Sequence, residues 1–150
     1  MKKGFTLLEL MVVIAIIGIL TSIILVSISA AKNKGFDAQV ESELSGVKSA
    51  ASIYYGNNGN SYIGHAGAGS NQCPSTGPTP FTMFADTNSN MATQVSYGEY
   101  PAGVSITCNA SDTAYAVQAN LSSANTYWCV DSTGASKQET TDLGDSTVCP

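Results

Sequence analysis

Residues 2–31 read KKGFTLLELMVVIAIIGILTSIILVSISAA, and this stretch determines how the rest of the 150-residue chain is organised. From Leu10 to Ala31 there are 22 consecutive residues without an ionisable side chain. A helix needs about 20 apolar residues to cross the hydrocarbon core of a bilayer. The sequence therefore predicts a membrane-spanning helix, and Lys2 and Lys3 place its N-terminal end in the cytoplasm by the positive-inside rule.

Glu9 lies at the start of this apolar run, where an unpaired charge is costly. Two general explanations are open. The run could belong to a secretory signal peptide that is cut near Ser29-Ala30-Ala31, although the apolar core of such peptides is shorter, at about 7–15 residues. It could also be a single-pass anchor whose glutamate reaches water at headgroup level, in the first helical turns where the macrodipole favours a negative charge.

A third explanation comes from resemblance. The sequence KKGFTLLE at residues 2–9 resembles the processing signal of type IV pilins and the related pseudopilins. The resemblance implies that a leader peptidase cuts between Gly4 and Phe5, that the new N-terminus on Phe5 is methylated, and that Glu9 acts in assembly. In a bundle of such helices, the amine of one subunit and the glutamate of a neighbour can neutralise each other. At an effective dielectric of about 20 this pairing recovers about 4 kcal/mol.

Apolar residues continue beyond residue 31 at spacings of three and four. They are Phe36, Val40, Leu44, Val47, Ala51 and Tyr54. This spacing predicts one face of an α-helix, on which we expect the head to pack; a coiled-coil seam is the alternative. The helix should run to about residue 55, because Gly56-Asn57-Asn58-Gly59 is a typical stop signal.

The second half of the chain predicts loops and strands. Residues 56–100 are rich in Gly, Asn, Ser, Thr and Pro, which indicates a long loop with little regular structure, most mobile around residues 64–69. Strand signals follow at residues 104–108, 114–121, 126–131 and 135–138, separated by turns, and predict an antiparallel meander. In the second strand, four apolar side chains alternate onto one face: Tyr115, Val117, Ala119 and Leu121. We expect Trp128 to be buried or half-buried.

Together these patterns predict an α+β fold. A long N-terminal α-helix, half membrane-spanning and half amphipathic, packs against a small C-terminal antiparallel β-sheet. The resemblance implies the ladle shape of pilin subunits. We expect a leader at residues 1–4, a transmembrane or filament-core helix at 5–31 and a globular head at 32–150, with the helix continuing to about 55, the loop at 56–100 and the meander at 104–150.

Four cysteines lie outside the apolar run: Cys73, Cys108, Cys129 and Cys149. In an exported chain this number indicates two disulfides, for which three pairings are possible. We favour Cys73–Cys108 and Cys129–Cys149, of which the second resembles the disulfide-bounded region of many pilins. A zinc site is disfavoured, because the chain has no C-x-x-C pair and His65 is its only histidine.

Charge and motifs narrow the function of the head. Once the leader is removed, four lysines face eleven acidic residues, so the side chains carry −7, and there is no arginine. This balance argues against nucleic-acid binding, which needs a basic face. No nucleophile motif is visible, so we do not expect an enzyme. Asp131, Asp142 and Asp145 could gather near the C-terminus around calcium, but they lack EF-hand spacing, and we expect neither a metal nor another cofactor.

We interpret the chain as a structural subunit of a type IV pilus-like surface filament, serving adhesion, motility or DNA uptake. Its implied partners are copies of itself and other pilins in a helical filament, a prepilin peptidase/N-methyltransferase and inner-membrane assembly machinery. Before assembly it would lie in the bacterial inner membrane with its head outside, and later in an extracellular filament or periplasmic pseudopilus. The alternatives are a pseudopilin of a type II secretion system and, in another class, a membrane-tethered binding module.

Overall fold

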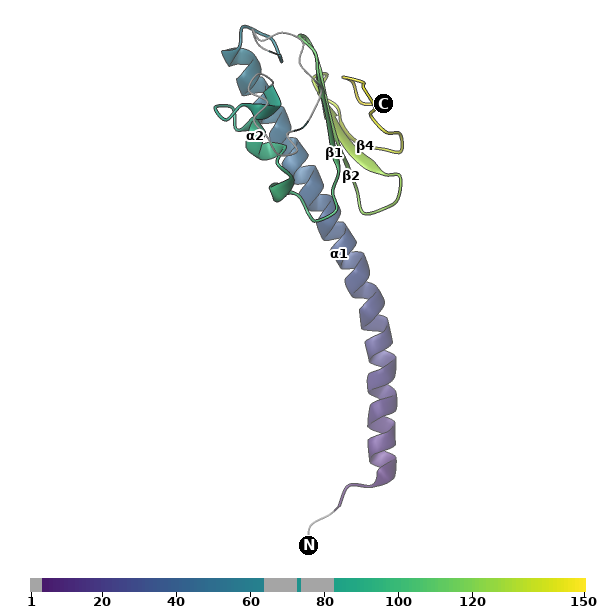
Figure 1. Cartoon of the computed structure of the whole chain (residues 1–150). Helices are drawn as coiled ribbons and strands as arrows, with labels where there is room; N and C mark the ends of the chain where they lie inside the picture. The colour runs from purple at the N-terminus through teal and green to yellow at the C-terminus, as the bar shows by residue number, and fades with distance from the viewer. Residues whose placement is uncertain (1–3, 64–72, 74–82) are drawn as a thin grey trace. The chain divides into compact units, whose positions relative to one another are not determined.

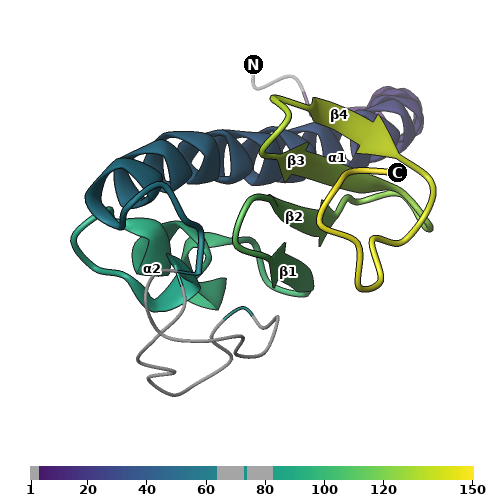
Figure 2. The same ribbon diagram turned by 90° about the horizontal axis from the view of Figure 1, so that it is seen from above.

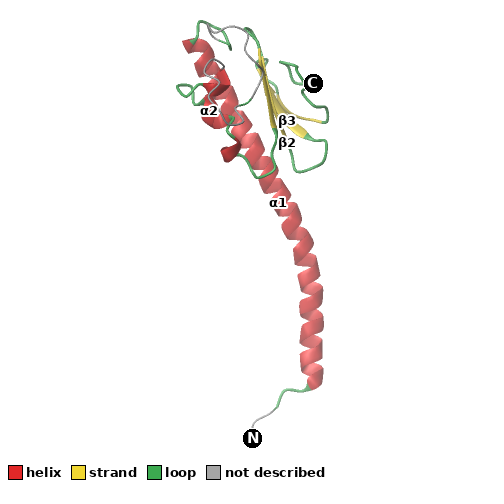
Figure 3. Ribbon diagram, viewed as in Figure 1, coloured by secondary structure: helices red, strands yellow, loops and turns green. Residues whose placement is uncertain are grey.

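The computed structural model describes residues 4–63, 73 and 83–150 (Figure 1). Helices come first and strands last, as Figure 3 shows. The elements are α1 (Leu7–Asn57), η1 (Met83–Ala85), α2 (Met91–Gln94), η2 (Tyr97–Glu99), β1 (Ile106–Ala110), β2 (Tyr115–Asn120), β3 (Tyr127–Asp131) and β4 (Ser136–Glu139). The chain divides into two units, Met1–Gly35 and Phe36–Pro150, and α1 contributes to both. This is the predicted α+β, pilin-like class: a long N-terminal helix followed by a small antiparallel sheet.

In the first unit, the apolar side chains of α1 that the structure describes are exposed. Residues from Leu7 to Ile24 are exposed on every side of the helix. Three hydroxyl groups in this run donate to carbonyl oxygens one turn back: Thr21 to Ile17, Ser22 to Ile19 and Ser27 to Ile23. Their polar atoms are therefore satisfied within the helix, as an apolar environment requires. By length and composition, α1 is the one helix among the described residues that could cross a membrane.

In the second unit, α1 buries the predicted apolar stripe. Val40, Leu44 and Val47 are fully buried, and Ala51 and Tyr54 nearly so. Phe36 is half-buried at the start of the same face. The prediction of one packed helical face is confirmed.

The helix ends close to its predicted stop signal. Its last residue is Asn57, two beyond the predicted end. Gly59 and Asn60 then adopt left-handed backbone conformations with φ of 68° and 62°. The amide of Asn60 donates back to the carbonyl of Tyr55 at 3.0 Å. The left-handed residues and this bond end the helix in the manner of a glycine-rich C-cap.

Four antiparallel strands form one sheet in the order β1-β2-β3-β4, which confirms the predicted meander. Cys108 pairs with Val117 and Val117 with Val130, so side chains from three strands meet on one face. Figure 2 shows this sheet lying along the head part of α1. The predicted alternation in β2 is confirmed, because Tyr115, Val117, Ala119 and Leu121 all enter the main core. The first strand starts two residues later than predicted, at Ile106.

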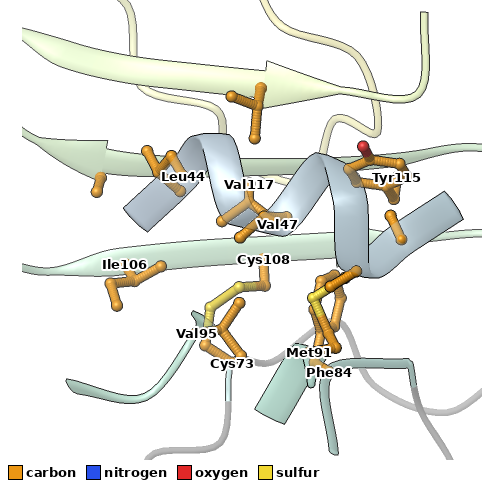
Figure 4. Close-up of a cluster of buried hydrophobic side chains, with 14 of the residues drawn as sticks. Leu44, Val47, Cys73, Phe84, Met91, Val95, Ile106, Cys108, Tyr115 and Val117 are labelled. Atoms are coloured by element: carbon orange, nitrogen blue, oxygen red, sulfur yellow. A yellow bond between two sulfur atoms is a disulfide. The ribbon is translucent and has the colours of Figure 1, made fainter. Parts of the chain in front are cut away.

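Residues 83–100 contradict the prediction of a long loop with little regular structure. They form three short helices, η1, α2 and η2, and they contribute core side chains. Met83, Phe84, Met91, Val95 and Tyr100 are all buried in the main core. Figure 4 shows Phe84, Met91 and Val95 in the same buried cluster as Leu44 and Val47 of α1. Helices of three or four residues are too short to give a periodic pattern. Their apolar residues are surrounded by Asn, Ser, Thr and Gly, which are typical of loops, and the segment was therefore predicted to be a loop. The glycine-rich residues 64–69, with His65, lie outside the described residues.

Candidate processing and assembly site

The start of α1 is fixed by a short set of hydrogen bonds. Residues 4–6 have no regular secondary structure, and the helix begins at Leu7. The Thr6 carbonyl accepts the first intrahelical bond from the Leu10 amide, at 3.4 Å, which makes Thr6 the N-cap. The predicted cleavage point between Gly4 and Phe5 therefore lies just outside the helix.

Thr6 and Glu9 form a capping box. The Thr6 amide and the Thr6 hydroxyl both donate to Oε2 of Glu9 at 2.9 Å. The Glu9 amide donates to the Thr6 hydroxyl oxygen at 3.3 Å. This is the reciprocal S/T-x-x-E arrangement in which the side chains at N-cap and N3 satisfy each other's backbone donors. Sequence reasoning singled out Glu9 as an assembly residue but overlooked its capping role, which the spacing Thr6-x-x-Glu9 could have revealed.

Gly4 and Phe5 are both open to an external enzyme. Phe5 is 85% exposed. A Cβ atom added at Gly4 would meet nothing within 4 Å in the described part of the chain. A larger side chain would therefore fit at this position within the described chain. A requirement for glycine by the processing enzyme would explain the residue.

In the head, the disulfides join Cys73 to Cys108 and Cys129 to Cys149, the pairing favoured from the sequence. Cys108 lies on β1 and Cys129 on β3, so each disulfide attaches a distant segment to the sheet. The four cysteines are all buried.

The C-terminal segment, which is the chain after β4 (residues 140–150), covers the face of the sheet that points away from α1 (Figures 1 and 2). Three buried polar side chains of the sheet form hydrogen bonds with the backbone of this C-terminal segment. Asn109 donates to the carbonyls of residues 144 and 146, both at 2.7 Å. Gln118 donates to the carbonyl of residue 141 at 2.9 Å and accepts from the amide of residue 143 at 2.8 Å. The third side chain, Asp131, accepts from the amide of Cys149 at 2.8 Å.

Asp131 is the centre of this attachment. Its carboxylate also accepts from the Thr133 amide at 2.8 Å, the Thr133 hydroxyl at 2.6 Å and the Ala135 amide at 3.2 Å. Burial by itself raises the pKa of this carboxyl, but the hydrogen bonds from Thr133, Cys149 and Ala135 outweigh it and hold the pKa below the ordinary value of 3.8. The carboxylate is thus charged and surrounded by donors.

The acidic residues near the C-terminus do not assemble a cation site in the described residues. Both Asp131 oxygens face hydrogen-bond donors. One Asp142 oxygen accepts from the Gly144 amide at 2.9 Å. N–H groups directed at an oxygen occupy the position that a calcium ion would need.

Polar bonds also tie α1 to the rest of the head. The Asp37 carboxylate accepts from the amide and the hydroxyl of Ser122, at 2.7 and 2.9 Å, in the turn between β2 and β3. Lys48 donates to the carbonyl of Gly134 at 3.2 Å, in the turn between β3 and β4. The helix is therefore attached to both of these sheet turns.

Comparison with known proteins supports the interpretation of the N-terminal segment. Residues 1–25 match the family model described as the prokaryotic N-terminal methylation motif, the leader signature of type IV pilins and pseudopilins. The leader motif and the α+β fold, a long N-terminal helix followed by a small antiparallel sheet, are both pilin-like. Neither the curated proteins nor the solved structures provide a match to the chain.

Proposed function

We propose that the chain is a structural subunit of a type IV pilus-like surface filament, built from the apolar half of α1. The observation that carries this proposal is the methylation motif at residues 1–25, which leads into a helix whose apolar side chains from Leu7 to Ile24 are exposed in the described part of the chain. Pilin-like proteins are structural rather than catalytic. The leader is removed between Gly4 and Phe5, and the new Phe5 amine is methylated by the prepilin peptidase/N-methyltransferase.

The exposed half of α1 supplies the packing. In the bacterial inner membrane its side chains contact lipid, with the N-terminus cytoplasmic and the head outside. In the filament, copies of the chain and other pilins replace the lipid through helix–helix packing. Inner-membrane assembly machinery delivers each subunit.

Charge pairing between neighbouring subunits sets the register in which each subunit is added to the filament. A lone carboxylate at the centre of a membrane helix costs about 2.5–3.5 kcal/mol on insertion scales. A nearby amine recovers about 4 kcal/mol at an effective dielectric of about 20. These two quantities are similar, so pairing of the Phe5 amine of one subunit with Glu9 of another contributes register more than net stability. Ten of the eleven acidic residues lie beyond residue 31, so the head carries most of the negative charge of the mature chain and keeps the filament surface soluble.

Two measurements test this proposal. Mass spectrometry of the mature protein should find an N-terminal methylated Phe5. Electron microscopy of cells that carry Glu9→Ala should show few or no filaments, while the processed subunit accumulates in the membrane. Asp145→Ala removes an exposed carboxylate of the head and serves as the matched control. An intact initiator methionine, or cleavage after residue 31, would refute the proposal, and so would normal filaments from Glu9→Ala.

The same images separate the two neighbouring functions. A type II secretion pseudopilin would leave the cell surface without fibres and would abolish release of a secreted enzyme when deleted. A membrane-tethered binding module would keep its binding in Glu9→Ala, because it does not polymerise.

A further inference from the structure

We propose that Thr6 is a positioning residue for the assembly carboxylate. It holds Glu9 by one oxygen and leaves the other oxygen for the amine of the neighbouring subunit. This inference rests on the proposed function, because it concerns how the glutamate meets its partner. The observation behind it is that two donors of Thr6 converge on the same carboxylate oxygen, Oε2.

The two oxygens of Glu9 are not equivalent. Oε2 accepts both the amide and the hydroxyl of Thr6, each at 2.9 Å, which uses the two acceptor sites of that oxygen. Oε1 accepts no hydrogen bond within the part of the chain that the structure describes. A glutamate side chain has many rotamers in the absence of such contacts. Here the bonds to Thr6 select the rotamers that turn the carboxylate back toward the helix start.

The site of cleavage preserves this arrangement. Cutting between Gly4 and Phe5 turns the amide of Phe5 into an amine but leaves the peptide bond between Phe5 and Thr6 intact. The Thr6 amide therefore still donates to Glu9 in the mature subunit. A cut one residue later would replace that amide by a charged N-terminal amine on Thr6, next to the glutamate of the same chain. Processing between Gly4 and Phe5 thus leaves the amide–carboxylate bond of the capping box unchanged.

The free oxygen suits the chemistry of the incoming group. A methylated N-terminal amine remains positively charged and has two N–H donors. One of these is sufficient for a charge-assisted hydrogen bond to Oε1, which is stronger than a neutral bond. Because Oε2 is already saturated, the neighbour's amine has one acceptor to find, and the register between the two helices is defined. Without the bonds to Thr6, the Glu9 carboxylate could adopt several rotamers and could accept from the same amine with either oxygen.

Three substitutions of Thr6 test this role against simple helix capping. Thr6→Ser keeps the amide, the hydroxyl and the cap. Thr6→Val keeps the shape but loses the hydroxyl. Thr6→Gly also loses the hydroxyl, yet glycine is an accepted N-cap residue, so the helix start is largely retained. The measured quantity is the fraction of processed subunit that is found in filaments, with mass spectrometry of cleavage and methylation on the same samples.

We expect Thr6→Ser to assemble like the natural chain, and Thr6→Val and Thr6→Gly to lose about tenfold or more of their assembled fraction, as for the loss of one bond to a charged group. Normal assembly of Thr6→Gly would show that Thr6 is only a helix cap and would overturn the inference. Failure of Thr6→Ser to assemble, or loss of cleavage in the variants, would overturn it as well.

Glu9→Ala is measured in parallel. If Glu9→Ala fails to assemble while all Thr6 variants assemble, only this inference is refuted. If Glu9→Ala assembles normally, the proposed function itself is refuted.

Discussion

Replacement of Asp131 should release the C-terminal segment from the sheet. Asp131 is 1% exposed, and its carboxylate accepts four hydrogen bonds, from the amides of Thr133, Ala135 and Cys149 and from the Thr133 hydroxyl. Asp131→Ala leaves four donors without this acceptor; the Cys149 amide is buried, whereas Thr133 is exposed and Ala135 half-buried, so water can reach part of the set. A buried donor left unsatisfied costs about 1–3 kcal/mol, and with the lost bonds to a charged group we expect a total loss of about 2–4 kcal/mol. Asp131→Asn keeps the shape and one acceptor, so about 1.5–3 kcal/mol is expected.

The assay is denaturant unfolding of the full chain in detergent micelles. The single tryptophan, Trp128, lies on β3 close to Asp131 and reports the loss of the sheet by its fluorescence. Asp145→Asn, in an exposed residue of the same C-terminal segment, is the control and should change the stability by less than about 0.5 kcal/mol. A loss below about 0.5 kcal/mol for Asp131→Ala would show that the carboxylate does not hold the segment.

Acid should act on the same group. The pKa of Asp131 is lowered in the folded state from the ordinary 3.8, so the folded state prefers the charged form more than the unfolded state does. Its contribution is therefore fully present above the ordinary pKa and is lost as the pH falls through the lowered folded value. Between pH 5 and the acid limit, the natural chain should lose more stability than Asp131→Asn. Parallel pH profiles for the two proteins would contradict this assignment.

Three further substitutions test the packing of the head, each by the same unfolding assay. Leu44→Ala, in the fully buried stripe, should cost about 2–5 kcal/mol, whereas Ile53→Ala, 50% exposed on the same helix, should cost under about 1 kcal/mol; equal losses would argue against the stripe. Asp37→Ala loses two bonds to the turn between β2 and β3 and should cost about 1–2 kcal/mol, and an unchanged stability would show that these bonds do not hold the turn. Removing the Cys129–Cys149 disulfide, with its sequence separation of 20, should cost about 3 kcal/mol in the chain-entropy picture, and an unchanged midpoint would refute this estimate.

The sequence allowed a good prediction of the face between helix and sheet. Residues such as Leu44 and Val117 occur at helical and strand periods, and period alone assigns them to a buried face. The other face of the sheet was not predictable in this way. Asn109, Gln118 and Asp131 are polar and occupy positions that normally face water, yet they are buried. They are buried because the C-terminal segment lies over them. This segment has no helical or strand pattern of apolar residues, so the sequence does not indicate which surface it covers.

The candidate site was predicted in part for a similar reason. A resemblance of eight residues was sufficient to select Gly4, Phe5 and Glu9. The bonds between Thr6 and Glu9 are local, and a capping-box rule applied to the same residues would have found them. The role proposed for the glutamate between subunits, by contrast, involves a second molecule, which no intrachain pattern can describe.

The attachment of the C-terminal segment has a consequence for how its surface can change. Asn109, Gln118 and Asp131 bind main-chain carbonyls and amides there, and not the side chains of the segment. Apart from the buried Leu143 and Cys149, and from Asp142 and Ser146, which bond the segment's own backbone, the side chains of this segment take little part in holding the fold. Substitutions at its outward positions alter what the head displays while the backbone stays anchored, so the exterior can diversify without loss of the scaffold.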